Sequence, residues 1–391
     1  MQRIRGSKIL IYAFFQILIL ASARGIIAPL IPLISGELGV GLDYIGSAIA
    51  LSIFALFFVS LTTGNMIEIM GLKKVLFIGL AINFAGSVML FFSYTFPMFI
   101  VAYFLMEMGV GILIIGNLSI VGTFYSKKKT SSLIKINYGN TTAFIVSPLL
   151  VSLLLFVEIN WRYYYIIHPA LLGILAIILW RMDIPRLVRV EASLRKLFRA
   201  NKWIVSNPAF LLCGFIILLY VSVMNTFYVW FTSYFTSIDI GINISSLFLS
   251  LYGAAIFLGM ILRNKLIQHF KKKRILFFSF TISIFLLAGI LFVDNLVAKN
   301  IFIFLFGIGI AGNFSLTFSI ASGLFPRHTN SASGLTVAFA NLGMMIFQYL
   351  SGYMSEYFSR NSVLYINLTL LVILIVLTSF LNFHRKFQRV F

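Results

Sequence analysis

Acidic residues and cysteine are scarce in this chain. Its 391 residues include ten Asp and Glu against 30 Lys and Arg, and one cysteine, Cys213, which lies in an apolar stretch. A single cysteine excludes an intrachain disulfide and a zinc site built from thiolates. Only 10% of the residues are charged, whereas 61% are hydrophobic. Because that balance is too apolar for a soluble protein, we predict an all-α integral membrane protein without a water-soluble domain.

The sequence motifs of common enzyme classes are also missing. The chain has no phosphate-binding loop with its lysine and no segment with paired carboxylates. Its four histidines, at positions 168, 269, 328 and 384, form no cluster with the spacing of metal ligands. We therefore expect no enzymatic activity, no cofactor and no bound metal.

Basic residues are abundant, and most fall in alternate gaps between apolar stretches. The clusters are Arg3, Arg5 and Lys8; Lys73 and Lys74; Lys127, Lys128, Lys129 and Lys135; Arg181, Arg186, Arg189, Arg195, Lys196, Arg199 and Lys202; Arg263, Lys265, Lys271, Lys272, Lys273 and Arg274; Arg327; and Arg385, Lys386 and Arg389. Because cytoplasmic loops retain Lys and Arg, the pattern predicts a multi-pass protein of the plasma (inner) membrane with both termini in the cytoplasm. Charges in short loops beside apolar runs favour anionic lipid headgroups, and not nucleic acid, as a partner.

Twelve apolar runs are long enough to cross a bilayer. They lie near 9–33, 44–66, 74–95, 98–124, 133–157, 163–181, 209–236, 246–267, 275–294, 300–324, 332–356 and 362–382. The first run also fits a signal peptide, since basic residues precede an apolar core that ends in Ala21-Ser22-Ala23. We favour a retained helix, because the apolar stretch resumes at Ile26.

The longest polar interval divides the twelve runs into six and six. It ends at Asn207-Pro208, where Asn can cap a helix and Pro suits the first turn. We predict an N-terminal six-helix bundle over 1–181, a cytoplasmic linker over 182–207 and a C-terminal six-helix bundle over 208–391. Duplicated helix bundles are typical of transporters in which two halves rock around a central site.

The segment between the second and third runs carries Gly64, Glu68, Gly71, Lys73 and Lys74. This spacing resembles the signature loop of the major facilitator superfamily. Other segments that resemble the superfamily are Pro29, Pro32 and Glu37-Leu38-Gly39 after the first run, Trp161-Arg162 before the sixth, and Ser333-Gly334 in the eleventh. The resemblance implies alternating access, with this loop and Arg263 of the corresponding loop in the second half acting in conformational switching.

Two charged residues lie deep inside apolar runs. Arg24 is about fifteen residues, or on the order of 22 Å, from the start of the first helix, and Glu107 is roughly 15 Å from the outer end of the fourth. The resemblance implies that the first, fourth, seventh and tenth helices line the cavity, so both side chains would face it. Organic-anion transporters of the superfamily resemble this chain in having an Arg at the position of Arg24. The alternative interpretation is a static salt bridge between two helices.

Uncharged polar groups supply further candidates for substrate binding or coupling. They are Asn137, Tyr138 and Asn140 on the fifth helix, Asn225, Trp230 and Tyr234 on the seventh, Asn313 on the tenth, and Asn341 and Gln348 on the eleventh. Amides near the bilayer centre need hydrogen-bond partners, which a solute or a neighbouring helix can provide. Trp230 and Tyr234 also fit an aromatic belt at the membrane interface, and the residues of the fifth helix also fit a packing seam.

The function that these features predict is secondary transport of a small polar or anionic organic solute, coupled to protons or another ion. Arg24 would contact the anion, and Glu107 would be its partner or the proton carrier. The alternative is efflux of amphipathic, drug-like or lipid-like compounds, which the aromatic content favours. A non-transporting membrane receptor or lipid-handling scaffold on the same fold is a third hypothesis. We expect the protein to act as a monomer.

The charge pattern makes a direct prediction about topology. Cysteines introduced at positions 40 and 239 should react with an impermeant thiol reagent added outside intact cells, because these loops lack the basic clusters. Cysteines at 128 and 195 should react only after the cells are permeabilised. The reverse labelling would contradict the predicted orientation.

Overall fold

The computed structural model describes residues 2–124, 129–184, 202–325 and 329–381. Every regular element in those residues is helical, and twelve spans are long and apolar enough to cross a membrane. The helices are α1 (Gln2–Leu38), α2 (Leu42–Met70), α3 (Leu72–Phe91), α4 (Phe96–Phe124), α5 (Lys129–Phe156), the short η2 (Trp161–Tyr163), α6 (Tyr164–Arg181), α8 (Pro208–Thr236), α9 (Ile242–Leu266), α10 (Lys272–Phe292), α11 (Leu296–Ile310), α12 (Asn313–Gly323), α13 (Thr329–Tyr357) and α14 (Ser362–Phe380). The predicted all-α fold with twelve membrane-spanning helices is confirmed. Most of the linker predicted over 182–207 lies outside the described residues.

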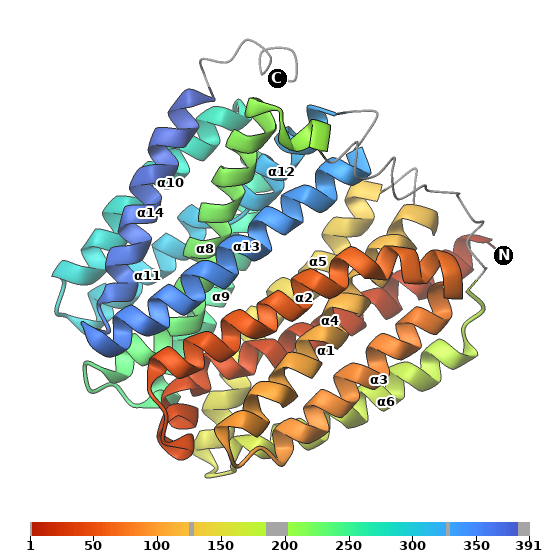
Figure 1. Ribbon diagram of the computed structural model, residues 1–391. Coiled ribbons are helices and arrows are strands. Elements are labelled where there is room, and N and C mark those ends of the chain that lie inside the picture. The colour runs from red at the N-terminus through yellow and green to blue at the C-terminus, as the bar shows by residue number, and fades with distance from the viewer. Residues whose placement is uncertain (1, 125–128, 185–201, 326–328, 382–391) are drawn as a thin grey trace.

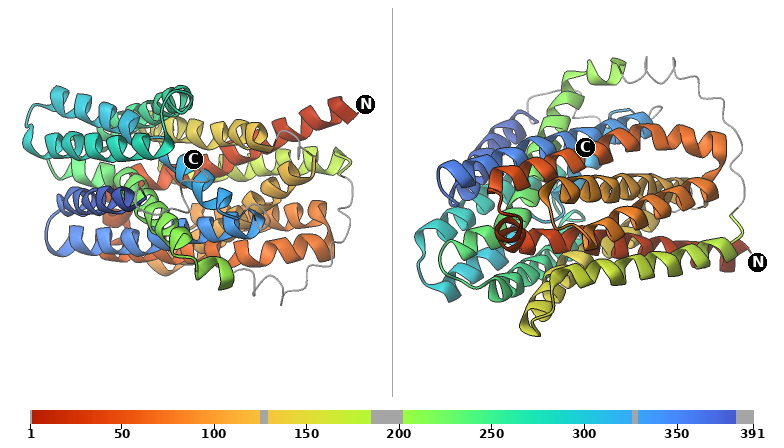
Figure 2. Two further views of the ribbon diagram at one scale, coloured as in Figure 1. Left: turned by 90° about the horizontal axis from the view of Figure 1, so that it is seen from above. Right: turned by 60° about the horizontal axis from the view of Figure 1, so that its bottom comes forward.

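The helices form two bundles, α1 to α6 and α8 to α14, which Figure 1 shows in red to yellow-green and in green to blue. The two views of Figure 2 show that the helices of both bundles share one general direction. The main contacts between the bundles join α2 with α13, α5 with α9, and α1 with α8, and α1 also contacts α9. The largest apolar core lies mainly in the second bundle, and two others lie almost entirely in the first.

Local sequence explains where the second bundle begins. The side chain of Asn207 accepts hydrogen bonds from the backbone nitrogens of Ala209 at 2.9 Å and Phe210 at 3.3 Å, and Pro208 occupies the first turn. This arrangement satisfies two of the donors that a helix N-terminus leaves free. The cap expected from the sequence is confirmed.

The tenth membrane span differs from the continuous helix that its sequence suggests. It consists of α11 and α12, which are separated at Ala311 and Gly312. Gly312 has a φ of +77°, a left-handed conformation that glycine adopts without steric cost. The glycines of this span therefore do more than pack against neighbouring helices, because Gly312 breaks the span.

The two bundles are in close contact at one end. We call the end with the start of α1 and the end of α14 the terminal face, and the other end the opposite face; Figure 1 marks both termini. A Cβ atom on Gly46 of α2 would lie 3.1 Å from the Cα of Gly352 on α13, near the opposite face. Towards the terminal face, a Cβ on Gly64 of α2 or Gly334 of α13 would meet nothing within 4 Å. The structure is therefore closed at the opposite face.

Polar contacts strengthen this closure. The carboxylate of Glu356, at the end of α13, accepts a hydrogen bond of 2.8 Å from the backbone nitrogen of Leu42 in the first turn of α2. The hydroxyl of Tyr357 lies 3.4 Å from the carboxylate of Asp43. A negative charge at a helix N-terminus is stabilising, so Glu356 caps a helix of the other bundle. That contact has to break before the opposite face can open.

Candidate functional site

The two intramembrane charges lie together. Nε of Arg24 on α1 donates a hydrogen bond of 2.7 Å to Oε1 of Glu107 on α4. The side chain of Glu107 is 1% exposed, whereas that of Arg24 is 29% exposed. Among the described residues this is the only hydrogen bond that Arg24 makes. Its two terminal amino groups are therefore free to bind a ligand, while the carboxylate is enclosed.

Three tyrosines surround the pair, and residue-by-residue reading of the sequence missed them. Tyr103, one turn before Glu107, is buried and close enough to interact electrostatically with both charges. The hydroxyl of Tyr165 donates to the backbone oxygen of Ala23 at 3.1 Å, and that of Tyr164 shares a hydrogen bond of 2.8 Å with Ser22. These contacts hold α1 against α6 beside Arg24. In a chain with 17 tyrosines, only their position next to the charges distinguishes them.

Several buried polar atoms near this site have no partner among the described residues. They include Oε2 of Glu107, both amide atoms of Asn117 on α4, and Oε1 of Gln16 on α1. Asn117 is 1% exposed and Gln16 is fully buried. An amide buried without a hydrogen bond costs free energy, so such groups usually hold water or a ligand. Asn117 and Gln16 are polar residues within apolar runs. That is the sequence feature by which they could have been identified as candidates.

The antiparallel packing of α1 and α4 orders these groups along the interface. Arg24 contacts Glu107, and towards the terminal face Ala13 shares a small apolar cluster with Val121. Gln16 and Asn117 fall between these two contacts. Gln16 and Asn117 each lie about one turn from the cluster of Ala13 and Val121, and Asn117 is about 15 Å along α4 from Glu107.

His168 on α6 is buried inside the first bundle. Its Nδ1 shares a hydrogen bond of 2.8 Å with the hydroxyl of Ser87 on α3, and its ring stacks on Tyr164. Tyr164 in turn connects it to Ser22, two residues before Arg24.

Trp230 and Gln348 bind each other inside the second bundle. Nε1 of Trp230 donates 2.8 Å to Oε1 of Gln348, and both side chains are buried. Tyr234 is also buried, and its hydroxyl accepts a hydrogen bond of 3.0 Å from Nζ of Lys299. None of these side chains faces the lipid. Trp230 also lies against Gly46 and Gly352, where the bundles close.

Asn313 and Arg263 belong to one network at the break in the tenth span. Nδ2 of Asn313 donates 2.7 Å to the hydroxyl of Ser279, which also accepts from Arg263 at 3.0 Å. Arg263 further donates to the backbone oxygens of Gly309 at 2.7 Å and Ala311 at 3.0 Å. These carbonyls end α11, where a cation is favourable.

Arg263 does not lie in the loop where the sequence places it. It lies inside α9, is 7% exposed, and holds the end of α11. Its contacts link α9 to α10 and α11 within the second bundle.

The remaining polar candidates are less constrained. Asn225 donates 2.9 Å to the backbone oxygen of Val221 in its own helix and is half-buried. Nδ2 of Asn341 is buried without a partner among the described residues. On α5, Asn137 is exposed, Asn140 is half-buried, and the ring of Tyr138 lies 5.6 Å from that of Phe257 on α9. Tyr138 therefore takes part in the contact between bundles.

The signature segment between α2 and α3 is shorter than the sequence suggests. Gly64 and Glu68 lie within α2, Lys73 and Lys74 lie within α3, and only Gly71 separates the helices, with a φ of +86°. Glu68 and Lys74 are exposed. Lys73 donates hydrogen bonds of 2.8 Å to the backbone oxygens of Trp180 and Met182, which ties the segment to the end of α6.

Comparison with known proteins agrees with this architecture. The family model for the major facilitator superfamily matches residues 13–336, and the chain belongs to that superfamily. It is therefore a membrane transporter of this class. No curated protein sequence matches the chain.

Solved structures share the fold at low sequence identity. A bacterial homologue of the human lysosomal transporter Spinster, in an inward-facing and unoccupied conformation, has 15% identity and a TM-score of 0.81, with 99% of this chain and 98% of that chain covered. The nucleoside transporter NupG has 18% identity and a TM-score of 0.74, with 97% and 100% covered. A D-xylose-proton symporter has 11% identity and a TM-score of 0.77, with 95% and 96% covered.

The unequal burial of the ion pair predicts unequal effects of its two single variants. Arg24→Gln leaves a buried carboxylate without its partner and should lower the free energy of unfolding by on the order of 2 kcal/mol or more. Glu107→Gln should cost less, because Arg24 still reaches solvent. The double variant should recover part of the loss. Thermal unfolding of the purified variants in detergent measures the relative stabilities of the two single variants and the double variant.

Glu68→Gln is the control, since its exposed carboxylate should change stability by no more than about 0.5 kcal/mol. Equal and additive effects of the two single variants would contradict a coupled pair.

Proposed function

We propose that the chain is a proton-coupled transporter of a small organic anion, with Arg24 as the group that binds the anionic part of the solute. The observation that carries this proposal is that Glu107 contacts only one side of the Arg24 guanidinium. Only Nε contacts Glu107, and the side chain is still 29% exposed. A guanidinium with free amino groups can bind a carboxylate or phosphate through two parallel hydrogen bonds.

Electroneutrality then suggests how a proton is coupled. In a site of low dielectric, Arg24 favours one compensating negative charge. Without solute, Glu107 supplies that charge. When a solute anion binds the guanidinium, Glu107 and the anion repel each other, and a proton on Glu107 removes the excess charge. One proton would thus bind together with one anion.

The unpaired polar atoms on α1 and α4 are candidates for a route of that proton. Oε2 of Glu107, the amide of Asn117 and Oε1 of Gln16 are buried and lack partners among the described residues. Waters that satisfy these atoms would connect Glu107 with the terminal face. In the orientation that the basic residues predict, this face is cytoplasmic and the closed face is external.

The second bundle would contact the uncharged part of the solute. Asn225 and Asn341 are the best candidates there, since Asn225 is half-buried and Nδ2 of Asn341 lacks a partner. The solved neighbours include a transporter of nucleosides and a proton symporter of D-xylose, which supports a small polar solute. We place the protein in the plasma membrane and expect it to act as a monomer.

A ligand screen tests the class of solute. Purified protein should be stabilised against heat by one or more small carboxylates or phosphates, because a ligand of the folded state raises its apparent stability. Sugars, neutral nucleosides and lipophilic cations form the comparison set. The shift should disappear in Arg24→Gln and persist in Glu68→Gln. Stabilisation by lipophilic cations alone, unchanged in Arg24→Gln, would support the efflux hypothesis instead.

Liposomes that contain the protein test the role of Glu107. With the solute identified, wild-type protein should accumulate it against its gradient when a proton gradient is imposed. Glu107→Gln should lose this accumulation but still exchange labelled for unlabelled solute, since Arg24 remains. Wild-type accumulation by Arg24→Gln/Glu107→Gln would leave the pair with a structural role only.

A further inference from the structure

A groove on the second bundle combines an apolar wall with two arginines. It lies between α9, α10 and the end of α11 and has a volume of about 390 Å³. Leu262, Phe278 and Ile282 line it and are 46%, 58% and 52% exposed. Such exposure of large apolar side chains in a membrane protein marks a surface that faces lipid. Arg263 and Arg274 line the same groove.

The two arginines differ in their exposure and in the hydrogen bonds that they make. Arg263 is 7% exposed and holds Gly309, Ala311 and Ser279. Arg274 is exposed, and no hydrogen bond or ion pair involves it among the described residues. Arg274 is thus the charge available to a ligand in the groove.

The two lysines that directly precede Arg274 make hydrogen bonds outside the groove. Nζ of Lys272 donates to the hydroxyl of Ser319 at 3.1 Å, and Nζ of Lys273 donates to the backbone oxygen of Leu381 at 2.7 Å. Both contacts lie away from the residues that line the groove.

The position of the groove along α10 suits a lipid. Arg274 lies in the first turn of α10, which begins at Lys272 near the terminal face. Ile282 follows eight residues later, so the wall extends about 12 Å further along the helix. A positive charge at the membrane surface above such a wall matches a phosphate headgroup above an acyl chain.

We propose that the groove binds an anionic phospholipid, with the phosphate at Arg274 and an acyl chain along Leu262, Phe278 and Ile282. In the predicted orientation the terminal face meets the cytoplasmic leaflet, whose anionic lipids attract basic residues near the surface. Gly309 also lines the groove, and its backbone oxygen accepts a hydrogen bond from Arg263. The lipid therefore lies beside the break in the tenth span. This inference does not depend on the transported solute.

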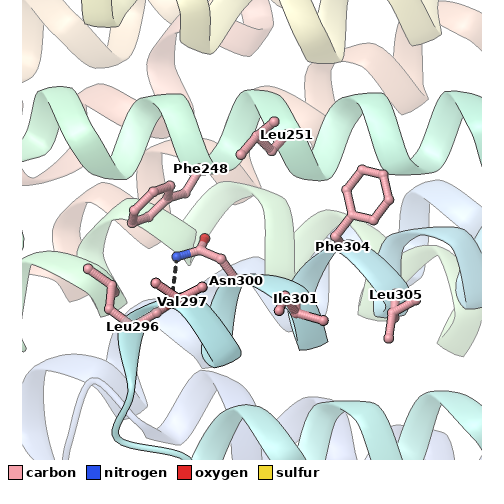
Figure 3. A pocket seen from close by; sticks show the side chains of 8 residues that line it. All are labelled: Phe248, Leu251, Leu296, Val297, Asn300, Ile301, Phe304 and Leu305. Carbon is pink, nitrogen blue, oxygen red and sulfur yellow. Dashed lines mark hydrogen bonds between the residues drawn. The ribbon is translucent and has the colours of Figure 1, made fainter.

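A second hollow on the same bundle provides an internal comparison. It has a volume of about 420 Å³, lies between α9 and α11, and is lined by Phe248, Leu251, Leu296, Val297, Asn300, Ile301, Phe304 and Leu305 (Figure 3). No basic residue lines it, and the amide of Asn300 donates 2.8 Å to the backbone oxygen of Leu296 in its own helix. A lipid here would be held by its acyl chain without selection for its headgroup.

Native mass spectrometry of the full chain in detergent tests the proposal. Phosphatidylglycerol and phosphatidylcholine with identical acyl chains are titrated separately, and the dissociation constant of the first bound lipid is measured. Wild-type protein should bind phosphatidylglycerol more tightly. Arg274→Gln should weaken that binding about fivefold, as expected for one basic residue near the surface, and weaken phosphatidylcholine binding less, because choline compensates the charge of its phosphate.

Lys265→Gln is the matched control, because Lys265 is an exposed basic residue of α9 that does not line the groove. It should change phosphatidylglycerol binding less than twofold. Leu262→Trp, which adds bulk to the wall, should also weaken phosphatidylglycerol, whereas water-soluble glycerol 3-phosphate should not compete at equal concentration. Equal effects of Arg274→Gln and Lys265→Gln, or equal affinity of wild-type protein for both lipids, would overturn the proposal.

Discussion

The cost of enclosing a carboxylate within the membrane governs the arrangement of the first bundle. Glu107 is 1% exposed, and its charge is compensated by a guanidinium 2.7 Å away. Because an uncompensated charge there is unfavourable, α1 and α4 are held in register at this level. The tyrosines 103, 164 and 165 pack around the same point and position α1. The exposed side of Arg24 is then the natural place for a second anion, so the constraint that holds the bundle together also defines the proposed binding site.

Conformational change has to alter the contacts between the bundles, whereas Arg24 and Glu107 both lie within the first bundle. At the opposite face, Gly46 and Gly352 let α2 and α13 approach closely, and Glu356 caps α2 from the other bundle. Both contacts join the bundles and break when they separate. Arg263 acts within the second bundle, where it holds the carbonyls that end α11 at the break near Gly312. The proposed lipid lies beside that break. A membrane lipid would therefore contact the point at which α11 ends and α12 begins.

The features that could be predicted from the sequence are those that depend on a single membrane span. Apolar length defined twelve helices, and Asn207 with Pro208 marked the start of α8. Arg24 and Glu107 stood out because charges in apolar runs are rare. Features that depend on neighbouring helices could not be read in this way. The carbonyls at the break near Gly312 are held by Arg263 on another helix, and the pairing of Trp230 with Gln348 joins residues 118 positions apart. Asn117 and Gln16 become informative only when burial shows that their amide atoms lack partners.

The most direct test of the central claim is the number of protons bound with each anion. Calorimetric titration of the purified transporter with its solute, in buffers of different ionisation enthalpy, measures this number without a membrane gradient. If Glu107 takes up a proton when the anion binds Arg24, wild-type protein should bind about one proton per solute at a pH where the empty site is ionised. Glu107→Gln should bind the solute with no proton uptake. Equal proton uptake by wild-type protein and Glu107→Gln, or none by either, would contradict the exchange of charges at Arg24.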